Sequence, residues 1–316
     1  MPTSTPSGLI EQIQALKRTQ NAVILAHNYQ PGPIQDLADY VGDSLAMARW
    51  AQASAAQRLV VAGVYFMAET AAILCPDKEV LIPDPEAGCS LAESITPAQL
   101  TAWKSQHPDA VVVSYVNTSA EIKALSDYCC TSANAVAVAQ SIPAEREILF
   151  LPDFFLGSHV ARMSGRTNIR VWLGECHVHA AIDPDALTAQ VARYPDAEVL
   201  IHPECGCTTR SLALPAAGIA TRVLSTDGMI AHTRASSANT FIIATEIGLL
   251  HRLRRQNPDK HFIAAQQEAR CPFMNMISLE KIHETLLSGR HRVTVPRPIR
   301  ERALLPLQRM VNAAPS

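Results

Sequence analysis

The sequence predicts an α/β fold in which small parallel sheets are covered by helices. Short apolar runs that are typical of buried strands alternate with helix-like segments along the 316 residues, and this alternation is the pattern of parallel sheets. Part of the alternation also repeats within the chain. A hydrophobic content of 48%, with 18% charged residues, supplies ample core for more than one domain.

The expected strands are apolar runs bounded by polar or glycine-containing loops. They cover residues 22–26, 59–64, 80–82, 110–114, 148–151, 169–173, 198–201, 222–224 and 240–244. The expected helices cover 34–56, 67–74, 120–127 and 133–140, and a first helix carries Ile10, Ile13 and Leu16 on one face. The helix over 34–56 is interrupted around Gly42, where Asp43 or Ser44 can cap a second segment. The tail after Gly289 is expected to pack on the surface.

The internal repeat is clearest between residues 81–92 and 150–161. In each stretch a strand is followed by Pro-Asp, three further residues and a Gly that opens a helix. A looser third copy runs from 225–229 to 240–248. Three units of about 90–100 residues fit the length and indicate pseudo-symmetry, although any α/β chain yields some matches of this kind by chance.

Charge and composition favour a small-molecule partner. The chain has 27 basic and 29 acidic residues, a net charge of −2, which predicts neither a nucleic-acid nor a membrane surface. No apolar run is long enough for a membrane span, and residues 1–7 lack the layout of a secretion signal. We therefore expect a cytoplasmic protein with reduced thiols. Arg252, Arg254 and Arg255 are expected to form the solvated basic end of a helix.

The eight cysteines include no Cys-x-x-Cys pair, which excludes zinc-ribbon and thioredoxin-like sites. Cys89, Cys176 and Cys271 are 87 and 95 residues apart, about one per unit, and each lies in an expected loop or helix start. If three units pack around one axis, these thiolates could converge. Three thiolates with an open fourth position suit an iron–sulfur cluster that binds substrate. The ordinary alternative is buried, free cysteine.

The other cysteines carry weaker signals. Cys75, Cys129 and Cys130 lie on helix-like stretches and are expected to fill the core. Cys205 and Cys207 could bind a metal or form a strained, redox-active disulfide, and a structural or incidental role is the favoured interpretation.

One short stretch gathers several reactive groups. Residues 173–179 place a thiol and two imidazoles, those of Cys176, His177 and His179, directly after the strand expected at 169–173. Ligands gather at the carboxyl edge of parallel sheets, because the loops there vary while the sheet fixes their position. A structural cysteine beside two surface histidines is the alternative.

Taken together, ordered blocks of this sequence resemble the quinolinate synthase family. The similarity runs from about residue 20 to 285 and includes 25–30, 38–39, 42–45, 115–120, 130–135, 151–153, 176–179, 202–205, 225–229 and 271–274. Two places differ from the commoner family wording. These are residues 207–210 and Asp227, and at both places the conformation of the loop is not predicted by the resemblance.

The resemblance implies three pseudo-symmetric αβα domains, each with a small parallel sheet, around a central active site. The expected domains are residues 1–101, 102–187 and 188–316. It also implies a 4Fe–4S cluster held by Cys89, Cys176 and Cys271, with one iron open. The family's reaction condenses iminoaspartate with dihydroxyacetone phosphate to quinolinate, with loss of phosphate and two waters, in NAD biosynthesis. A functional link to an aspartate-oxidising enzyme would fit this reaction.

The resemblance also carries over a set of site residues. The implied substrate-binding positions are His27, Ser44, Tyr115, Val116, Asn117, Ser132, His179, His202, Pro203, Glu204 and Thr226. Hydroxyls, amides and helix N-termini suit substrates that carry carboxylates and a phosphate. We expect Glu204 and Tyr29 to be the acid–base residues and His202 and His27 to position substrate. The open iron would act as a Lewis acid.

Two other functions fit part of the pattern. An iron–sulfur hydro-lyase acting on a hydroxy acid would use the same open iron without condensation. A non-catalytic metal-binding or redox-sensing protein would instead depend on Cys205 and Cys207.

Overall fold

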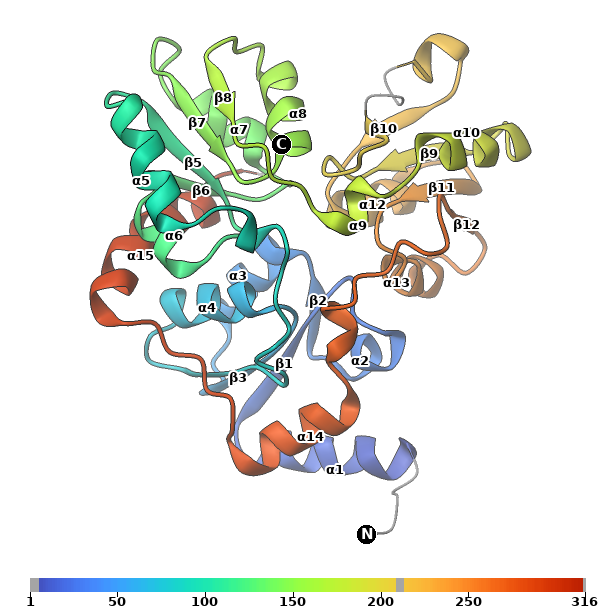
Figure 1. Ribbon diagram of the computed structural model, residues 1–316. Coiled ribbons are helices and arrows are strands. Elements are labelled where there is room, and N and C mark those ends of the chain that lie inside the picture. The colour runs from blue at the N-terminus through green and yellow to red at the C-terminus, as the bar shows by residue number, and fades with distance from the viewer. Residues whose placement is uncertain (1–5, 209–212, 315–316) are drawn as a thin grey trace.

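The strands form three separate four-stranded sheets, and each sheet is entirely parallel (Figure 1). The computed structural model describes residues 6–208 and 213–314. Each sheet has the same order, in which the first strand of a unit lies between its second and third strands and the fourth lies at the edge. This shared order confirms the predicted α/β class with three pseudo-symmetric αβα domains. The domain boundaries expected at 101/102 and 187/188 stay predictions.

The first unit occupies the lower part of Figure 1. Its helices and strands are α1 (Pro6–Thr19), β1 (Ala22–His27), α2 (Gly32–Leu37), β2 (Tyr40–Gly42), α3 (Ser44–Ala53), β3 (Arg58–Ala62), α4 (Tyr65–Leu74) and β4 (Glu79–Leu81). The central strands are buried along most of their length, as expected for parallel strands covered on both faces.

The second unit lies at the upper left of Figure 1 and the third at the upper right. The second consists of η1 (Ala92–Ser94), α5 (Pro97–Gln106), β5 (Val111–Tyr115), α6 (Ala120–Ala124), β6 (Tyr128–Cys130), α7 (Ala135–Ser141), β7 (Ile148–Leu151), α8 (Phe154–Ser164) and β8 (Ile169–Val171). The third consists of α9 (His177–Ala180), α10 (Pro184–Arg193), β9 (Glu198–Ile201), η2 (Pro215–Ala217), β10 (Thr221–Val223), α12 (Thr226–Ala235), β11 (Thr240–Ala244), α13 (Leu249–Gln256), β12 (His261–Ala264) and η3 (Met274–Met276).

The last two helices return to the other two units. Helix α14 (Leu279–Ser288) packs against α1, and α15 (Arg297–Asn312) packs against α6, β6 and α4 (Figure 1). Ala303, Leu307 and Met310 of α15 are fully buried. The expectation of a surface tail is therefore wrong, because this helix completes a core that other elements leave open.

Three local predictions need correction. Residues 34–56 are two helices separated by β2, which pairs with β1, so Asp43 caps α3 by accepting a hydrogen bond from the Ala46 amide at 2.9 Å. Cys129 and Cys130 lie in strand β6 rather than in a helix. Strand β12 is likewise absent from the expected strands. Strands β2 and β6 have three residues each and β12 has four, too few to show a clear period of two.

The repeat is real, but the alignment between its first two copies is displaced by one strand. Residues 81–92 begin at the end of β4, the fourth strand of its unit, whereas 150–161 begin in β7, the third strand. The alignment of 150–161 with 240–248 is in register, because β7 and β11 are each the third strand of their sheets.

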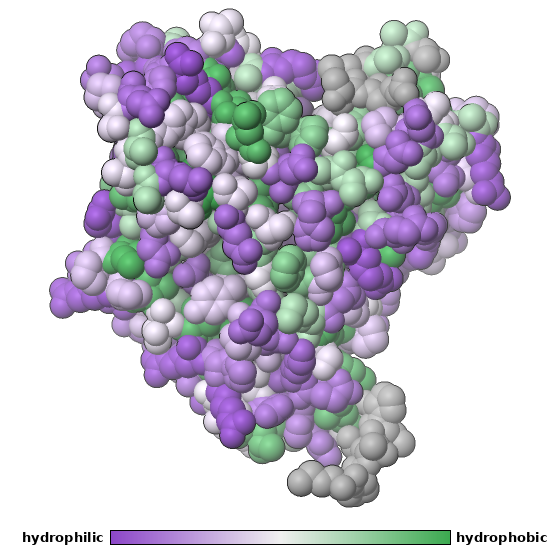
Figure 2. All heavy atoms as spheres, in the orientation of Figure 1, coloured by the Kyte–Doolittle hydropathy of each residue, from purple (hydrophilic) through white to green (hydrophobic). Residues whose placement is uncertain are grey.

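The surface is largely polar. On the face shown in Figure 2, hydrophilic side chains predominate and apolar ones are scattered among them. Within the described ranges, none of the helices combines the length and apolar character that a bilayer span requires.

We expect Leu307→Ala to lower the free energy of unfolding by about 2–5 kcal/mol, since it leaves a cavity in a closed core. Leu305 is the matched control on the same helix, because its side chain is 53% exposed and that of Leu307 is 0%. Leu305→Ala should change stability by less than about 0.5 kcal/mol. Urea denaturation measures both variants, and equal effects would contradict the packing of α15 described above.

Candidate active site at the junction of the three units

A cavity lies where the three units meet, at the carboxyl ends of their strands, and side chains from all three line it. A lining residue lies at the end of the first strand of each unit or directly after it. His27 is the last residue of β1, Tyr115 is the last residue of β5, and His202 directly follows β9. The three-fold repetition of the sheets therefore brings three ring side chains to one place.

Hydroxyl groups occupy a second set of equivalent positions. Ser44, Ser132 and Thr226 follow β2, β6 and β10, the second strand of each unit, and all three line the cavity. Ser44 and Thr226 are also the first residues of α3 and α12. Helix N-termini carry unpaired N–H groups and partial positive charge, so these positions suit anions.

The three cysteines with wide spacing form a third equivalent set. Cys89, Cys176 and Cys271 follow β4, β8 and β12, the fourth strand of each unit, and line the same cavity as free thiols. Burial raises the pKa of all three thiols, that of Cys89 to about 12. Neutral thiols buried at such a site would ionise on binding a metal centre, which supplies the compensating positive charge.

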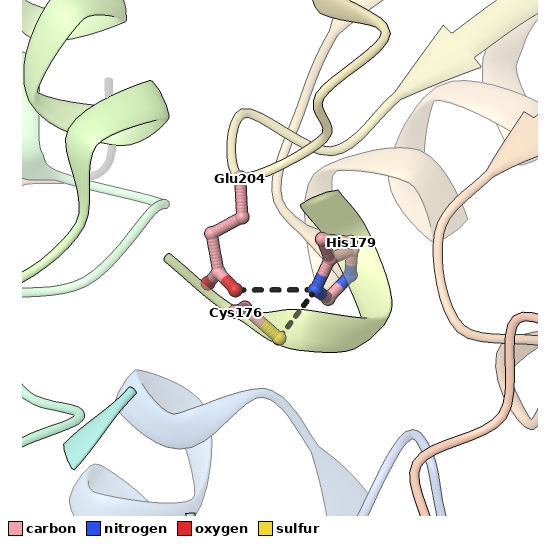
Figure 3. A group of neighbouring side chains, drawn as sticks. All are labelled: Cys176, His179 and Glu204. Atoms are coloured by element: carbon pink, nitrogen blue, oxygen red, sulfur yellow. Dashed lines mark hydrogen bonds and ion pairs between the residues drawn. The ribbon is translucent and has the colours of Figure 1, made fainter. Parts of the chain in front are cut away.

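Figure 3 shows a compact polar group of the cavity, formed by Cys176, His179 and Glu204. The Nδ1 atom of His179 lies 3.3 Å from the Cys176 sulfur and 3.2 Å from Oε2 of Glu204. One donor atom from each residue lies within 4.8 Å of the others, so this group could hold a metal ion. Burial opposes charge on His179, but the Cys176 sulfur and the Glu204 carboxylate raise its pKa to about 10.

Glu204 is a buried carboxylate with several partners. The Tyr115 hydroxyl donates to its Oε1 atom. Burial alone would favour the protonated acid, but the charge and hydrogen bond of His179 lower the pKa of Glu204 to about 2. A buried, ionised carboxylate requires such partners. The site therefore keeps a proton acceptor at neutral pH.

Tyr29 retains its proton. Burial raises the pKa of its hydroxyl well above the usual range, and Glu204 adds to the effect. The hydroxyl lies 2.7 Å from Oγ1 of Thr245 and 3.2 Å from Nε2 of His179. Tyr29 thus offers a proton on the opposite side of His179 from Glu204.

Two further histidines of the cavity, His27 and His202, are neutral. Burial lowers the pKa of both His27 and His202 to about 3. Nδ1 of His27 accepts the Tyr29 backbone N–H at 3.2 Å, so its proton lies on Nε2. Nδ1 of His202 and Oδ1 of Asn117 are buried, and within the described residues they have no hydrogen-bond partner. Unpaired polar atoms in a cavity are available to a ligand.

The structure brings together most of the residues expected from the sequence. The cavity is lined by His27, Tyr29, Ser44, Cys89, Tyr115, Asn117, Ser132, Cys176, His179, His202, Glu204, Thr226 and Cys271. Val116 instead lines a smaller, mainly apolar cavity next to it. Pro203 lies between His202 and Glu204 in the chain and is outside both lining sets.

Sequence reasoning missed Thr245 and Glu246. Thr245 bonds both Tyr29 and His179, and Glu246 accepts the backbone N–H of Cys271 at 3.1 Å. Burial raises the pKa of Glu246 to about 7. Their position directly after the expected strand 240–244 was a usable signal, because lining residues follow the other strands too.

Cys205 and Cys207 form a disulfide, and both are fully buried. The expectation of reduced thiols is therefore wrong for this pair, and neither sulfur is available to a metal in this state. Both pack in a core of the third unit. The disulfide is one of the alternatives that the sequence offered, and the structural or incidental role favoured there stays a prediction. Residues 209 and 210 of the unusual segment 207–210 lie outside the described residues.

Fold and site together define an α/β protein of three repeated units with a buried, metal-capable centre at their junction. A family model described as "Quinolinate synthetase A protein" matches residues 11–312. The chain therefore belongs to the quinolinate synthase family of enzymes, as the sequence resemblance predicted.

Named relatives agree over nearly the full length. A quinolinate synthase of Pyrobaculum aerophilum is 51% identical over 307 residues, which cover 97% of this chain and 100% of the relative. One of Thermus thermophilus is 51% identical over 303 residues, 96% of each chain. One of Mycobacterium leprae is 51% identical over 305 residues, which cover 95% of this chain and 87% of the relative.

The pKa of Asp43 generates a prediction about stability. Burial, together with repulsion from Asp227, raises this pKa from 3.8 to about 7. As pH rises from about 4 to about 7, the unfolded chain loses this proton while the folded chain keeps it, so ionisation destabilises the fold. Asp43→Asn keeps an acceptor for the Ala46 amide but cannot ionise. The free energy of unfolding of the wild type should therefore fall relative to that of Asp43→Asn over this pH range.

The control is Asp36→Asn, at a side chain that is 46% exposed. Slight burial of Asp36 raises the pKa of its carboxyl group. The hydrogen bonds and charges of His251 and Arg255 outweigh this effect, so the pKa is lowered overall. Relative to Asp36→Asn, the free energy of unfolding of the wild type should rise slightly over this pH range. The rise should be small, because solvent screens the charges of Asp36, His251 and Arg255. Chemical denaturation at pH 4, 5.5 and 7 measures both, and parallel curves for wild type and Asp43→Asn would contradict the raised pKa.

Proposed function

We propose that this chain is itself a quinolinate synthase that condenses iminoaspartate with dihydroxyacetone phosphate to quinolinate, with loss of phosphate and two waters, in NAD biosynthesis. One observation carries the proposal. Three free cysteines, one after the fourth strand of each sheet, line the same cavity as a buried carboxylate, a neutral tyrosine and three hydroxyls. We also propose an aspartate-oxidising enzyme as the source of the imine.

Cys89, Cys176 and Cys271 would hold a 4Fe–4S cluster. Soft thiolates are the ligands that iron–sulfur clusters prefer, and three of them leave one iron open. When bound, such a centre supplies a Lewis acid that polarises a hydroxyl or carbonyl oxygen of the substrate. His179 would then act on the Cys176 sulfur through its hydrogen bond and fix the orientation of this ligand.

Neutral groups of the chain would bind the anionic substrates. Ser44, Ser132 and Thr226 can each donate a hydroxyl hydrogen, and Asn117 can donate from its amide. Nε2 of neutral His27 provides a further N–H group. Because these donors carry no charge, they hold a carboxylate or phosphate without neutralising Glu204.

Proton transfer would use Glu204 as the acceptor and Tyr29 as the donor. The low pKa of Glu204 keeps it ionised, and the raised pKa of Tyr29 keeps its proton in place. Condensation requires a proton to leave carbon and protons to reach the departing water oxygens. The two residues lie on either side of His179, whose ring contacts both.

An anaerobic assay tests the reaction. Wild-type enzyme supplied with both substrates should form a pyridine dicarboxylate, detected by mass. Glu204→Gln should keep the cluster absorbance and lower kcat by about 10²–10⁴-fold, the range for loss of an acid–base group. Glu198→Gln is the control, because Glu198 pairs with His232 outside the cavity. Unchanged turnover of Glu204→Gln would contradict its role, and absence of any pyridine product would favour the hydro-lyase.

Cluster ligation is tested by replacing single cysteines with serine. Cys89→Ser, Cys176→Ser and Cys271→Ser should each lose most of the iron and sulfide of the anaerobically purified protein. Cys75→Ser should retain both, since Cys75 caps the end of α4 outside the cavity. Iron and sulfide analysis decides between the outcomes. Loss of iron only after substitution of Cys205 or Cys207 would instead support the metal-binding or redox-sensing alternative.

A further inference from the structure

We propose that Arg252, Asp227 and Asn28 form a positioning group that fixes the Thr226 hydroxyl as a hydrogen-bond donor toward the substrate. The inference rests on the proposed function, in which Thr226 holds an anionic group of the substrate. None of the other three residues lines the cavity. They act on the substrate through Thr226.

The contacts of Asn28 fix the orientation of its amide. Its Oδ1 atom accepts a hydrogen bond from Nη1 of Arg252 at 2.6 Å. Its Nδ2 atom donates to Oγ1 of Thr226 at 2.8 Å and to Oδ1 of Asp227 at 2.9 Å. A guanidinium only donates and a carboxylate only accepts, so a flipped amide would lose both contacts. The –NH₂ group of Asn28 must therefore face Thr226.

This orientation decides the direction of the Thr226 hydroxyl. Its oxygen accepts the hydrogen bond from Asn28, so its own hydrogen is free for another acceptor. Among the hydrogen bonds of the described residues, none has this hydroxyl as donor to a protein atom. Thr226 is 2% exposed and lines the cavity. Its hydrogen is thus available to a carboxylate or phosphate bound there.

Asp227 and Arg252 support Asn28 without adding net charge. Nη1 of Arg252 also donates to Oδ1 of Asp227 at 3.0 Å, and Oδ2 of Asp227 lies 3.3 Å from the backbone nitrogen of Asp43. The ion pair therefore joins α12 and α13 of the third unit to the loop after β1 and β2 of the first. Because the charges of Arg252 and Asp227 cancel, the pair changes the electrostatic field at an anionic ligand in the cavity very little.

The setting of Arg252 differs from that of its neighbour Arg255. The side chain of Arg252 is 20% exposed, whereas that of Arg255 is 63% exposed and pairs with Asp36 at the surface. The expectation that both form a solvated basic end is therefore wrong for Arg252. Arg255 on the same helix provides a matched control.

The test reverses the polarity of the group while preserving its composition and charge. In the double variant Asn28→Asp with Asp227→Asn, residue 28 offers only acceptors, so the Thr226 hydroxyl donates to it rather than to a ligand. Calorimetric titration of the anaerobically purified enzyme with quinolinate measures Kd. We expect the double variant to bind about ten- to a hundredfold more weakly, the effect of one hydrogen bond to a charged group.

The comparison with Thr226→Val separates positioning from general damage. Thr226→Val should weaken binding to a similar extent, and adding it to the double variant should weaken binding no further, because both remove the same hydrogen bond. Arg252→Gln should weaken binding severalfold, Arg252→Lys should restore part of the loss, and Arg255→Gln should bind as the wild type does. The Arg252 series also serves if the double variant fails to fold, as its melting temperature would reveal.

Three results would overturn the inference: wild-type Kd in the double variant, multiplicative losses with Thr226→Val, or wild-type Kd in Arg252→Gln. A wild-type enzyme that neither binds nor forms quinolinate would reject the proposed function itself. That outcome is seen before any variant is made, so the two failures are distinguishable.

Discussion

The structure depends on one geometric constraint, the identical strand order of three parallel sheets whose carboxyl ends face a common junction. Parallel strands deliver the loops that follow them to one edge, and repetition of the unit multiplies this effect. Imidazole or phenol groups lie at the ends of the first strands or directly after them, hydroxyls follow the second strands, and thiols follow the fourth. Residues that are far apart in the chain therefore meet because they are equivalent, without any special long-range signal in the sequence.

Burial then determines which of these groups carry charge. The same desolvation acts on every group of the site, but its outcome depends on the neighbours. His27 and His202 become neutral, whereas Glu204 stays ionised because His179 balances it. A buried ion pair is maintained only where each charge has its partners in place. Thr245 contributes here, since its hydroxyl contacts the ring of His179.

Much of the fold and site could be predicted from the sequence, and the failures have physical reasons. The wide spacing of Cys89, Cys176 and Cys271 pointed to one thiol per repeat, and their loop positions proved equivalent. Strands β2, β6 and β12 were missed because runs of three or four residues show no clear periodicity. Arg252 was taken for a solvated residue, since composition cannot show that a helix end faces another unit. The family resemblance identified Thr226, but not Asn28 or Asp227, whose contribution lies in contacts with their neighbours.

The path of the C-terminal helices bears on how the chain is made. Helix α14 packs on the first unit and α15 on the second, although both follow the third in sequence. During synthesis, domains generally fold in order from the N-terminus. In this chain the apolar surfaces that the first two units present to α14 and α15 are covered only after these two helices have been synthesised. These two packing interfaces therefore form after synthesis of the third unit, rather than as the first and second units emerge.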